Sequence, residues 1–175
     1  MKQNQQWYAI RVTYSREMKL KTFLDKNKIE NFLPMHYTLT KKKNKSIKSL
    51  VPVIHNLIFI KSDRKTIDTL KLELEAQIPM RYIIDKTTNL PIIIPEQQMK
   101  NFIAVAGTLN EQLLYLNDID SNLERGDKVR IIGGIFSGIE GTIFRIKRDR
   151  RVVVSVKGVI AVATAFIPPS LVEKI

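Results

Sequence analysis

Cysteine is absent from the 175-residue chain, which excludes disulfides, thiolate catalysis and thiolate metal sites. No window approaches the roughly 20 apolar residues that a membrane-spanning helix needs, and residues 1–20 lack the hydrophobic core of a signal peptide. From these absences we expect a cytoplasmic protein with no membrane segment. Hydrophobic residues still make up 44% of the chain, enough for a core in one large domain or two small ones.

Acidic residues are scarce where basic residues are dense. The formal net charge is +12, with 12 Lys/Arg against 3 Asp/Glu in residues 1–50, 7 against 10 in residues 51–124, and 10 against 4 in residues 125–175. Such a charge points to a polyanionic partner, with a merely solvated basic surface as the alternative. Its concentration at both ends favours two regions that face nucleic acid.

Motifs of catalysis and metal binding are also missing. The sequence holds no phosphate loop of the Walker type, no nucleophile elbow and no carboxylate pair in a pattern that identifies acid–base chemistry. His36 and His55 are 19 residues apart, without a carboxylate at ligand spacing. We therefore expect a protein that is not an enzyme and that has neither a metal site nor a cofactor.

The first 107 residues combine strand and helix patterns. Alternating residues predict a strand over 7–14, and Ser15 can cap a helix that follows. Asp63 is placed to favour the N-terminus of a later helix. Further strands are predicted near 32–39, 50–60, 80–84 and 91–94, and further helices over 63–75 and 95–107. This order predicts an α+β domain, with helices on an antiparallel sheet, that ends near Gly107.

A run of lysines separates two of these strands, and like charges this dense disfavour regular structure. We expect a mobile hairpin tip that contacts nucleic acid, with a purely solubilising role as the alternative. The lysines are Lys41, Lys42, Lys43, Lys45 and Lys48.

Residues 108–123 have the composition of a linker, although the apolar run 113–116 predicts that part of it docks. Residues 126–147 show two strand patterns around a glycine-dense turn and resemble a KOW motif. In that motif Gly134, Phe136, Gly138 and Gly141 match, and Ile135 stands where proline is usual. With the strand patterns that follow, residues 124–175 predict a small five-stranded β-barrel.

The combination resembles the NusG family of transcription elongation factors over nearly the whole chain. Trp7 and Tyr8 match the Trp-Tyr pair that opens the family's N-terminal (NGN) domain. The stretch His55-Asn56-Leu57-Ile58-Phe59-Ile60 keeps only the hydrophobic end of the family's Pro-Gly-Tyr-Val-Phe-Val strand. In this departure the chain resembles specialised paralogues of the UpxY type more than the general factor. Those paralogues antiterminate long operons for capsular and other surface polysaccharides.

The resemblance implies that residues 1–107 bind the clamp helices of the largest RNA polymerase subunits and suppress pausing. By position, an apolar patch of Tyr8, Ile54, Leu57 and Phe59 makes this contact, and Asp68 and Thr69 touch the opposite side of the cleft. Burial in the sheet is the competing interpretation, above all for Phe59, because large apolar residues usually serve packing.

The resemblance also implies nucleic-acid contacts, to DNA or nascent RNA. Arg11, Arg16 and Lys19 match the basic face with which related specialised factors meet DNA. A second cluster of Arg148, Arg150 and Arg151 suits phosphate contact, unless it is a solvated hairpin.

The KOW domain of this family recruits a small ribosomal subunit protein, the factor Rho or RNA. Phe136 and Ile139 occupy the loop that would present apolar contacts to such a partner. Folding of Phe136 back over the barrel end is the alternative.

We therefore expect a monomeric transcription factor that promotes processive antitermination of a long operon, such as one for surface polysaccharide. Its domains are expected at 1–107 and 124–175, joined by the linker 108–123. Two alternatives stay open: a general NusG role in elongation and termination, and an RNA-binding, ribosome-associated protein with a KOW domain. β-branched residues in 152–156 favour a permanent barrel over the helical form that some related factors adopt.

Overall fold

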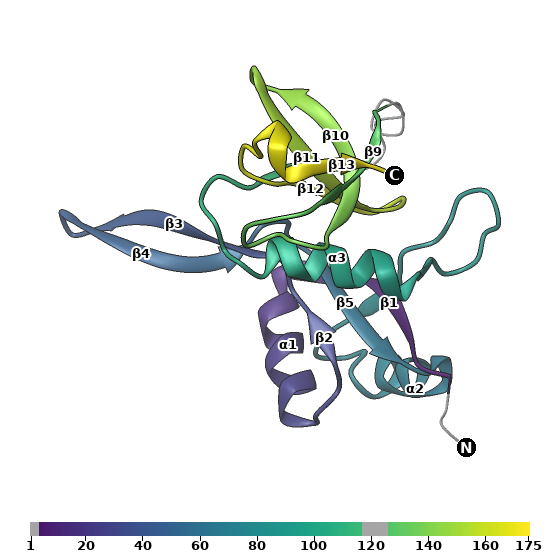
Figure 1. Cartoon of the computed structure of the whole chain (residues 1–175). Coiled ribbons are helices and arrows are strands. Elements are labelled where there is room, and N and C mark those ends of the chain that lie inside the picture. The colour runs from purple at the N-terminus through teal and green to yellow at the C-terminus, as the bar shows by residue number, and fades with distance from the viewer. Residues whose placement is uncertain (1–3, 117–125) are drawn as a thin grey trace. The chain divides into compact units, whose positions relative to one another are not determined.

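The computed structural model describes residues 4–116 and 126–175, which form two compact units, Met1–Glu96 and Gln97–Ile175 (Figure 1). The division falls at the start of α3 (Glu96–Ala106), a helix that the sequence analysis places in the first domain. Residues 117–123 of the predicted linker lie outside the described residues. The domain boundaries at 107 and 124 stay predictions.

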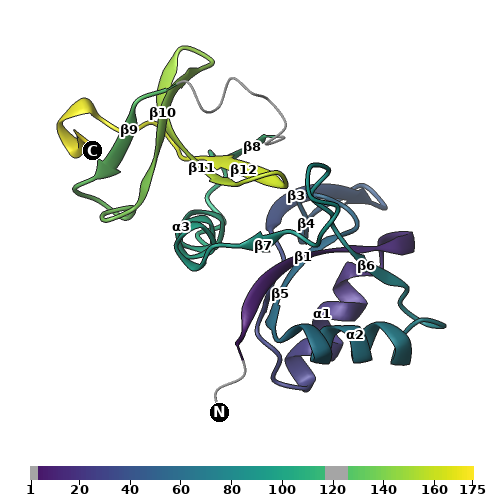
Figure 2. The ribbon, with the colours of Figure 1, turned by 90° about the vertical axis from the view of Figure 1, so that its right-hand side faces the viewer.

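The first unit is built on one antiparallel sheet with the strand order β2-β5-β1-β6, in which β7 also pairs with β1. Its strands are β1 (Gln6–Val12), β2 (Asn31–Phe32), β5 (Leu57–Ser62), β6 (Met80–Tyr82) and β7 (Ile93–Ile94). Helices α1 (Glu17–Lys26) and α2 (Arg64–Glu73) lie on the same side of this sheet (Figure 2). Helices on an antiparallel sheet are the predicted arrangement.

Apolar burial holds the helices and the sheet of this unit together. Ile10 of β1, Ile58 of β5, Leu20 and Leu24 of α1 and Ile67 of α2 are all 0% exposed. Burial of one such side chain contributes about 1.5–3 kcal/mol to folding. Leu20 and Leu24 therefore belong to the buried face of α1, and Ile67 to that of α2.

The two helices begin in different ways. The Asp63 carboxylate caps α2 as predicted, because it accepts hydrogen bonds from the Thr66 backbone N–H at 2.9 Å and the Thr66 hydroxyl at 2.6 Å. The prediction that Ser15 caps α1 is wrong. The chain instead makes a short 3-10 turn, η1 (Thr13–Ser15), with φ of 58° at Tyr14 and 51° at Ser15, and no side chain caps α1. Non-glycine residues in this left-handed region cost about 1–3 kcal/mol each.

The lysine-rich segment forms a separate hairpin of β3 (Met35–Lys42) and β4 (Lys45–Pro52), which extends away from the sheet of the first unit (Figure 1). Its turn residues Lys43 and Asn44 have φ of 45° and 62°, as in the tight turns whose twist suits antiparallel strands. The hairpin was predicted, but regular pairing continues up to the turn, against the expectation for dense charge. Neighbouring lysines within one strand point to opposite faces of the ribbon, although Lys42 and Lys45 lie directly opposite each other beside the turn.

The second unit contains α3 and one antiparallel sheet with the strand order β13-β9-β10-β11-β12-β8. Its strands are β8 (Leu114–Leu116), β9 (Lys128–Ile131), β10 (Glu140–Ile146), β11 (Asp149–Val156), β12 (Ile160–Ala163) and β13 (Val172–Lys174), and η3 (Pro169–Leu171) precedes the last of them.

Five strands of this sheet lie within the segment predicted to hold five. The sixth, β8, comes from the predicted linker and pairs with β12. Leu114 and Leu116 pack against Val153, Ala161 and Ala163. Docking of the apolar part of the linker is thereby confirmed.

Candidate binding surfaces

The apolar patch predicted around β5 is divided by the sheet. In the strand register Ala9 lies opposite Phe59 and Arg11 opposite Leu57, so these residues share one face, whereas Tyr8 lies opposite Ile60 and belongs to the other face. Phe59, Leu57 and Tyr8 are buried, with exposed fractions of 0%, 5% and 3%. Ile54 precedes the strand and is half-buried. The structure thus brings Leu57 and Phe59 together and separates Tyr8 from them.

Tyr8 belongs to an aromatic cluster beside α2. Its ring centroid lies 5.5 Å from that of Tyr82, and its hydroxyl donates to Gln6 Oε1 at 3.1 Å. The Tyr82 hydroxyl donates to Asp68 Oδ1 at 2.8 Å. Burial raises the pKa of Tyr82 well above its ordinary value, and the hydrogen bond to Asp68 raises it further. Both phenols are therefore neutral hydrogen-bond donors at any physiological pH.

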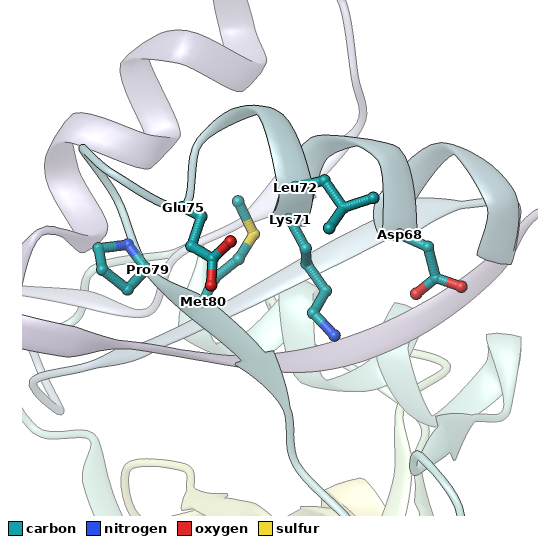
Figure 3. A pocket seen from close by; sticks show the side chains of 6 residues that line it. All are labelled: Asp68, Lys71, Leu72, Glu75, Pro79 and Met80. Carbon is teal, nitrogen blue, oxygen red and sulfur yellow. The ribbon is translucent and has the colours of Figure 1, made fainter.

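Asp68 and Thr69 lie on α2, where their polar groups already have partners. Besides the bond from Tyr82, Asp68 Oδ2 lies 3.5 Å from the Arg64 guanidinium, and the Thr69 hydroxyl donates to Lys65 O at 2.9 Å. Asp68 nevertheless keeps 47% of its side chain exposed. It stands at one end of an open cleft between α2 and the chain before β6 (Figure 3), whose other lining residues are Lys71, Leu72, Glu75, Pro79 and Met80.

The three basic residues near the end of β1 differ in how they are held. Arg11 is exposed on the sheet face that carries Leu57, and Lys19 is exposed on α1. Arg16 is half-buried: it donates to the Gln77 carbonyl oxygen, and its guanidinium carbon lies 5.3 Å from the centre of the Tyr14 ring. The Tyr14 side chain is 77% exposed. Arg11 and Lys19 are thus the more available cations.

All five lysines of the β3–β4 hairpin are exposed. The Lys48 ammonium lies 4.6 Å from the centre of the Tyr37 ring. Tyr37 and Leu39 are 42% and 72% exposed on the hairpin face that also carries Lys41 and Lys48. Their alternation with polar residues predicts the strand, but no signal in the sequence shows that its apolar face stays open.

In the loop between β9 and β10, the two residues predicted to contact a partner are buried. Phe136 and Ile139 are only 3% and 6% exposed, as expected for the alternative in which Phe136 folds back. The backbone N–H of Gly138 donates to Ile131 O at 2.7 Å and closes the loop. Ile132 and Ile135 are the apolar residues that this loop exposes, at 51% and 75%.

The arginines at the β10–β11 turn have two roles. Lys147 and Arg148 form the turn with φ of 51° and 72°, and Arg148 and Arg150 are exposed. Arg151 has only 11% of its side chain exposed, and it donates to Gln112 O at 2.7 Å and Thr164 O at 2.9 Å. Its guanidinium therefore fastens the segment before β8 to β11 and is not a free phosphate ligand.

A buried carboxylate at the first position of α1 was not predicted from the sequence. Glu17 is 1% exposed, and its Oε1 lies 3.3 Å from Nδ1 of His55, whose side chain is 72% exposed. The other oxygen, Oε2, has no hydrogen-bond partner. Over residues 4–116 and 126–175, no group of three His, Cys, Asp or Glu residues could hold a metal ion.

Comparison with protein families gives one match. Residues 5–103 match the family described as transcription termination factor nusG, a range that covers the first unit from residue 5 onward and most of α3. A comparison with curated proteins gives no match. No helix in the described part of the chain has the length and apolar content needed to cross a membrane.

Proposed function

Because the chain belongs to the NusG family, whose members are non-enzymatic transcription elongation and termination factors that bind RNA polymerase, we propose that it contacts the clamp helices of the largest polymerase subunit. The first unit makes this contact. The observation that carries the proposal is the match of residues 5–103 to the family.

The polymerase contact is assigned according to exposure. Ile54, Asp68 and Thr69 keep part or all of their side chains accessible and meet the polymerase directly. Leu57 and Phe59 lie beneath the surface and fix its shape, because a buried side chain cannot touch a partner without local opening. Tyr8 supports α2 from the other face of the sheet.

We propose further that the factor promotes processive antitermination of one long operon, such as an operon for surface polysaccharide. The departures from the general pattern support this, namely Leu57 in place of the usual tyrosine and Ile135 in place of proline. The basic residues Arg11 and Lys19 and the hairpin lysines contact DNA or nascent RNA, as their exposure permits.

The second unit presents a KOW domain to a small ribosomal subunit protein or to Rho. The exposed Ile135, at the tip of the loop that buries Phe136, is the apolar contact that this surface offers. Arg148 and Arg150, at the β10–β11 turn of the same unit, provide exposed positive charge. The protein acts in the cytoplasm as a monomer.

Binding of the full-length chain to core RNA polymerase tests the main proposal. Ile54→Glu is expected to weaken binding about tenfold or more, because the new charge must be desolvated in an apolar contact. Ile84→Glu is the matched control, since Ile84 is an exposed isoleucine of the same unit outside the proposed patch. Equal binding of the two variants, with both still folded, would remove the patch from the polymerase contact.

A terminator assay tests the direction of the effect. Addition of the chain to elongating polymerase should increase read-through of a terminator within the target operon. An increase at every terminator would indicate the general NusG role. Steeply salt-dependent RNA binding without any polymerase binding would instead support the ribosome-associated alternative.

A further inference from the structure

The second unit contains an open cleft with an aliphatic floor and a basic rim, which we call the basic cleft. It lies among four neighbouring strands, β13, β9, β10 and β11 (Figure 1), and its volume is about 430 Å³. The floor residues are buried or half-buried, and the rim residues are exposed. The floor is formed by Val129, Ile143 and Val172, and the rim by Arg145, Arg150 and Lys174. Its size and its mostly apolar floor are those of ligand-binding clefts.

The strand register brings the floor and the rim together. Val129 of β9 lies opposite Gly141 of β10, and directly opposed residues share a face of the sheet. Alternate residues along β10 return to that face, so Ile143 and Arg145 lie on it as well. Arg150 of β11 lies opposite Arg145 and joins the same face. The two arginines therefore stand beyond the end of the aliphatic floor.

The positive charge of this rim is not compensated within the described part of the chain. Asp127, the acidic residue among the described residues that line the cleft, pairs with the Lys174 ammonium at 2.9 Å. Arg145 donates to the Arg148 carbonyl oxygen at 3.4 Å. Among the described residues, no carboxylate pairs with Arg145 or Arg150. A complementary ligand thus carries an anionic group beside an apolar one.

We propose that the basic cleft binds an acidic segment of a protein partner. One aliphatic side chain of that segment lies on the floor, and adjacent carboxylates meet Arg145 and Arg150. A guanidinium group presents its N–H donors in a planar fork that matches the two oxygens of a carboxylate. Exposed ion pairs alone contribute little, so burial of the aliphatic side chain supplies the affinity and the carboxylates fix the register.

The lining of the cleft favours a protein segment over a nucleic-acid strand. Bases stack on exposed aromatic rings, whereas this floor is aliphatic. Phe144 also lines the cleft, but it packs against the core cluster around Val153. The Asp127 carboxylate at the rim repels a phosphate backbone, which has no N–H to donate. A peptide backbone has such donors, and a carboxylate accepts from them.

The basic cleft is a different surface from the apolar contact proposed at Ile135. The loop that carries Ile135 joins β9 to β10 between Ile131 and Glu140. Arg145 lies near the other end of β10, beside the turn into β11. The second unit therefore has two separate protein-binding surfaces, and binding at the cleft does not depend on the proposed polymerase contact.

Titration of the full-length chain with two capped peptides tests the cleft. The amide NMR signals of Ile143, Arg145 and Val172 are followed as Glu-Asp-Leu-Asp-Glu or Glu-Asp-Ser-Asp-Glu is added at constant KCl. The leucine peptide should give saturable shifts and bind about tenfold more tightly than the serine peptide, because only leucine buries an apolar side chain on the floor. Equal affinities, or no saturable shift at millimolar peptide, would overturn the proposal.

Two substitutions locate the charge that the leucine peptide recognises. Arg145→Gln should weaken its binding about tenfold, because the carboxylates lose a charged hydrogen-bond donor. Lys128→Gln is the matched control: Lys128 is exposed beside Val129 on β9 but lies on the opposite face, and its loss should leave the affinity unchanged. Equal effects of the two substitutions would reduce the cleft to general positive charge. Shifts of the same amides with a single-stranded oligothymidylate but not with the leucine peptide would show a phosphate site instead.

Discussion

Substitution of Gly141 by alanine should damage the second unit far more than the same change at Gly134. A Cβ atom at position 141 would lie 2.5 Å from the Val153 carbonyl oxygen and 2.8 Å from Cγ1 of Val152. The oxygen belongs to the backbone of β11, which is paired to β10 and cannot swing away as a side chain can. The strands must separate locally, and the cost of about 2–3 kcal/mol lies in the upper part of the range for overpacking.

Gly134 provides the matched control. Nothing lies within 4 Å of a Cβ built there, but its φ of +77° is left-handed. Alanine at position 134 therefore costs about 1 kcal/mol of backbone strain and no clash. Both glycines match the KOW pattern, so the sequence alone does not separate their roles.

Hydrogen exchange of the β10 and β11 amides measures this difference in the full-length chain. A loss of 2–3 kcal/mol accelerates exchange by about 30-fold or more, since each 1.4 kcal/mol is a factor of ten. The fluorescence of Trp7, which lies in the first unit, should show an unchanged unfolding transition. An effect of Gly134→Ala as large as that of Gly141→Ala would refute the steric argument.

Two further substitutions test the roles of single charged groups. Arg151→Gln should destabilise the second unit by about 1–3 kcal/mol in the same exchange assay, because the Gln112 and Thr164 carbonyls lose their donor. Nucleic-acid affinity should fall only in the exposed control Arg150→Gln. Loss of nucleic-acid affinity in Arg151→Gln without loss of stability would show that Arg151 is a ligand. The Thr66 hydroxyl and backbone N–H lower the pKa of Asp63, so its contribution to stability is present at neutral pH and is lost as the pH falls through that lowered value, below the ordinary 3.8. Urea denaturation of Asp63→Asn against wild type should therefore show a difference that disappears in acid, and a difference that persists there would contradict the assignment.

The sequence predicts elements well where local signals and burial agree. The helix over 63–75 combines apolar spacing with a capping aspartate, and the structure has both in α2. The hairpin is predicted from the strands that flank the lysines. The regular pairing up to the turn is not predicted, because dense like charges disfavour regular structure. Along each strand, however, neighbouring lysines point to opposite faces.

The candidate sites are harder to predict, because exposure depends on the register between strands. Leu57 and Tyr8 are equally apolar in the sequence, yet the pairing of β1 with β5 places them on opposite faces. Phe136 and Ile135 are neighbours, and only the loop closed by Gly138 decides that the isoleucine is exposed.

Asn56 is a departure from the motif of the resembling family that has a local structural role. Asn56 stands where the resembling family has glycine, and it takes the left-handed conformation that glycine adopts most readily, with φ of 69°. Asparagine adopts this conformation more readily than most residues. Its Oδ1 accepts a hydrogen bond from the Ser15 N–H at 2.8 Å, which glycine cannot do, and its backbone oxygen accepts from Val12 N–H at 3.0 Å. The substitution thereby ties the strained turn after β1, which precedes Arg16, to the loop that carries Ile54. Asparagine at this position thus adopts the left-handed conformation and also supplies a side-chain acceptor that glycine lacks.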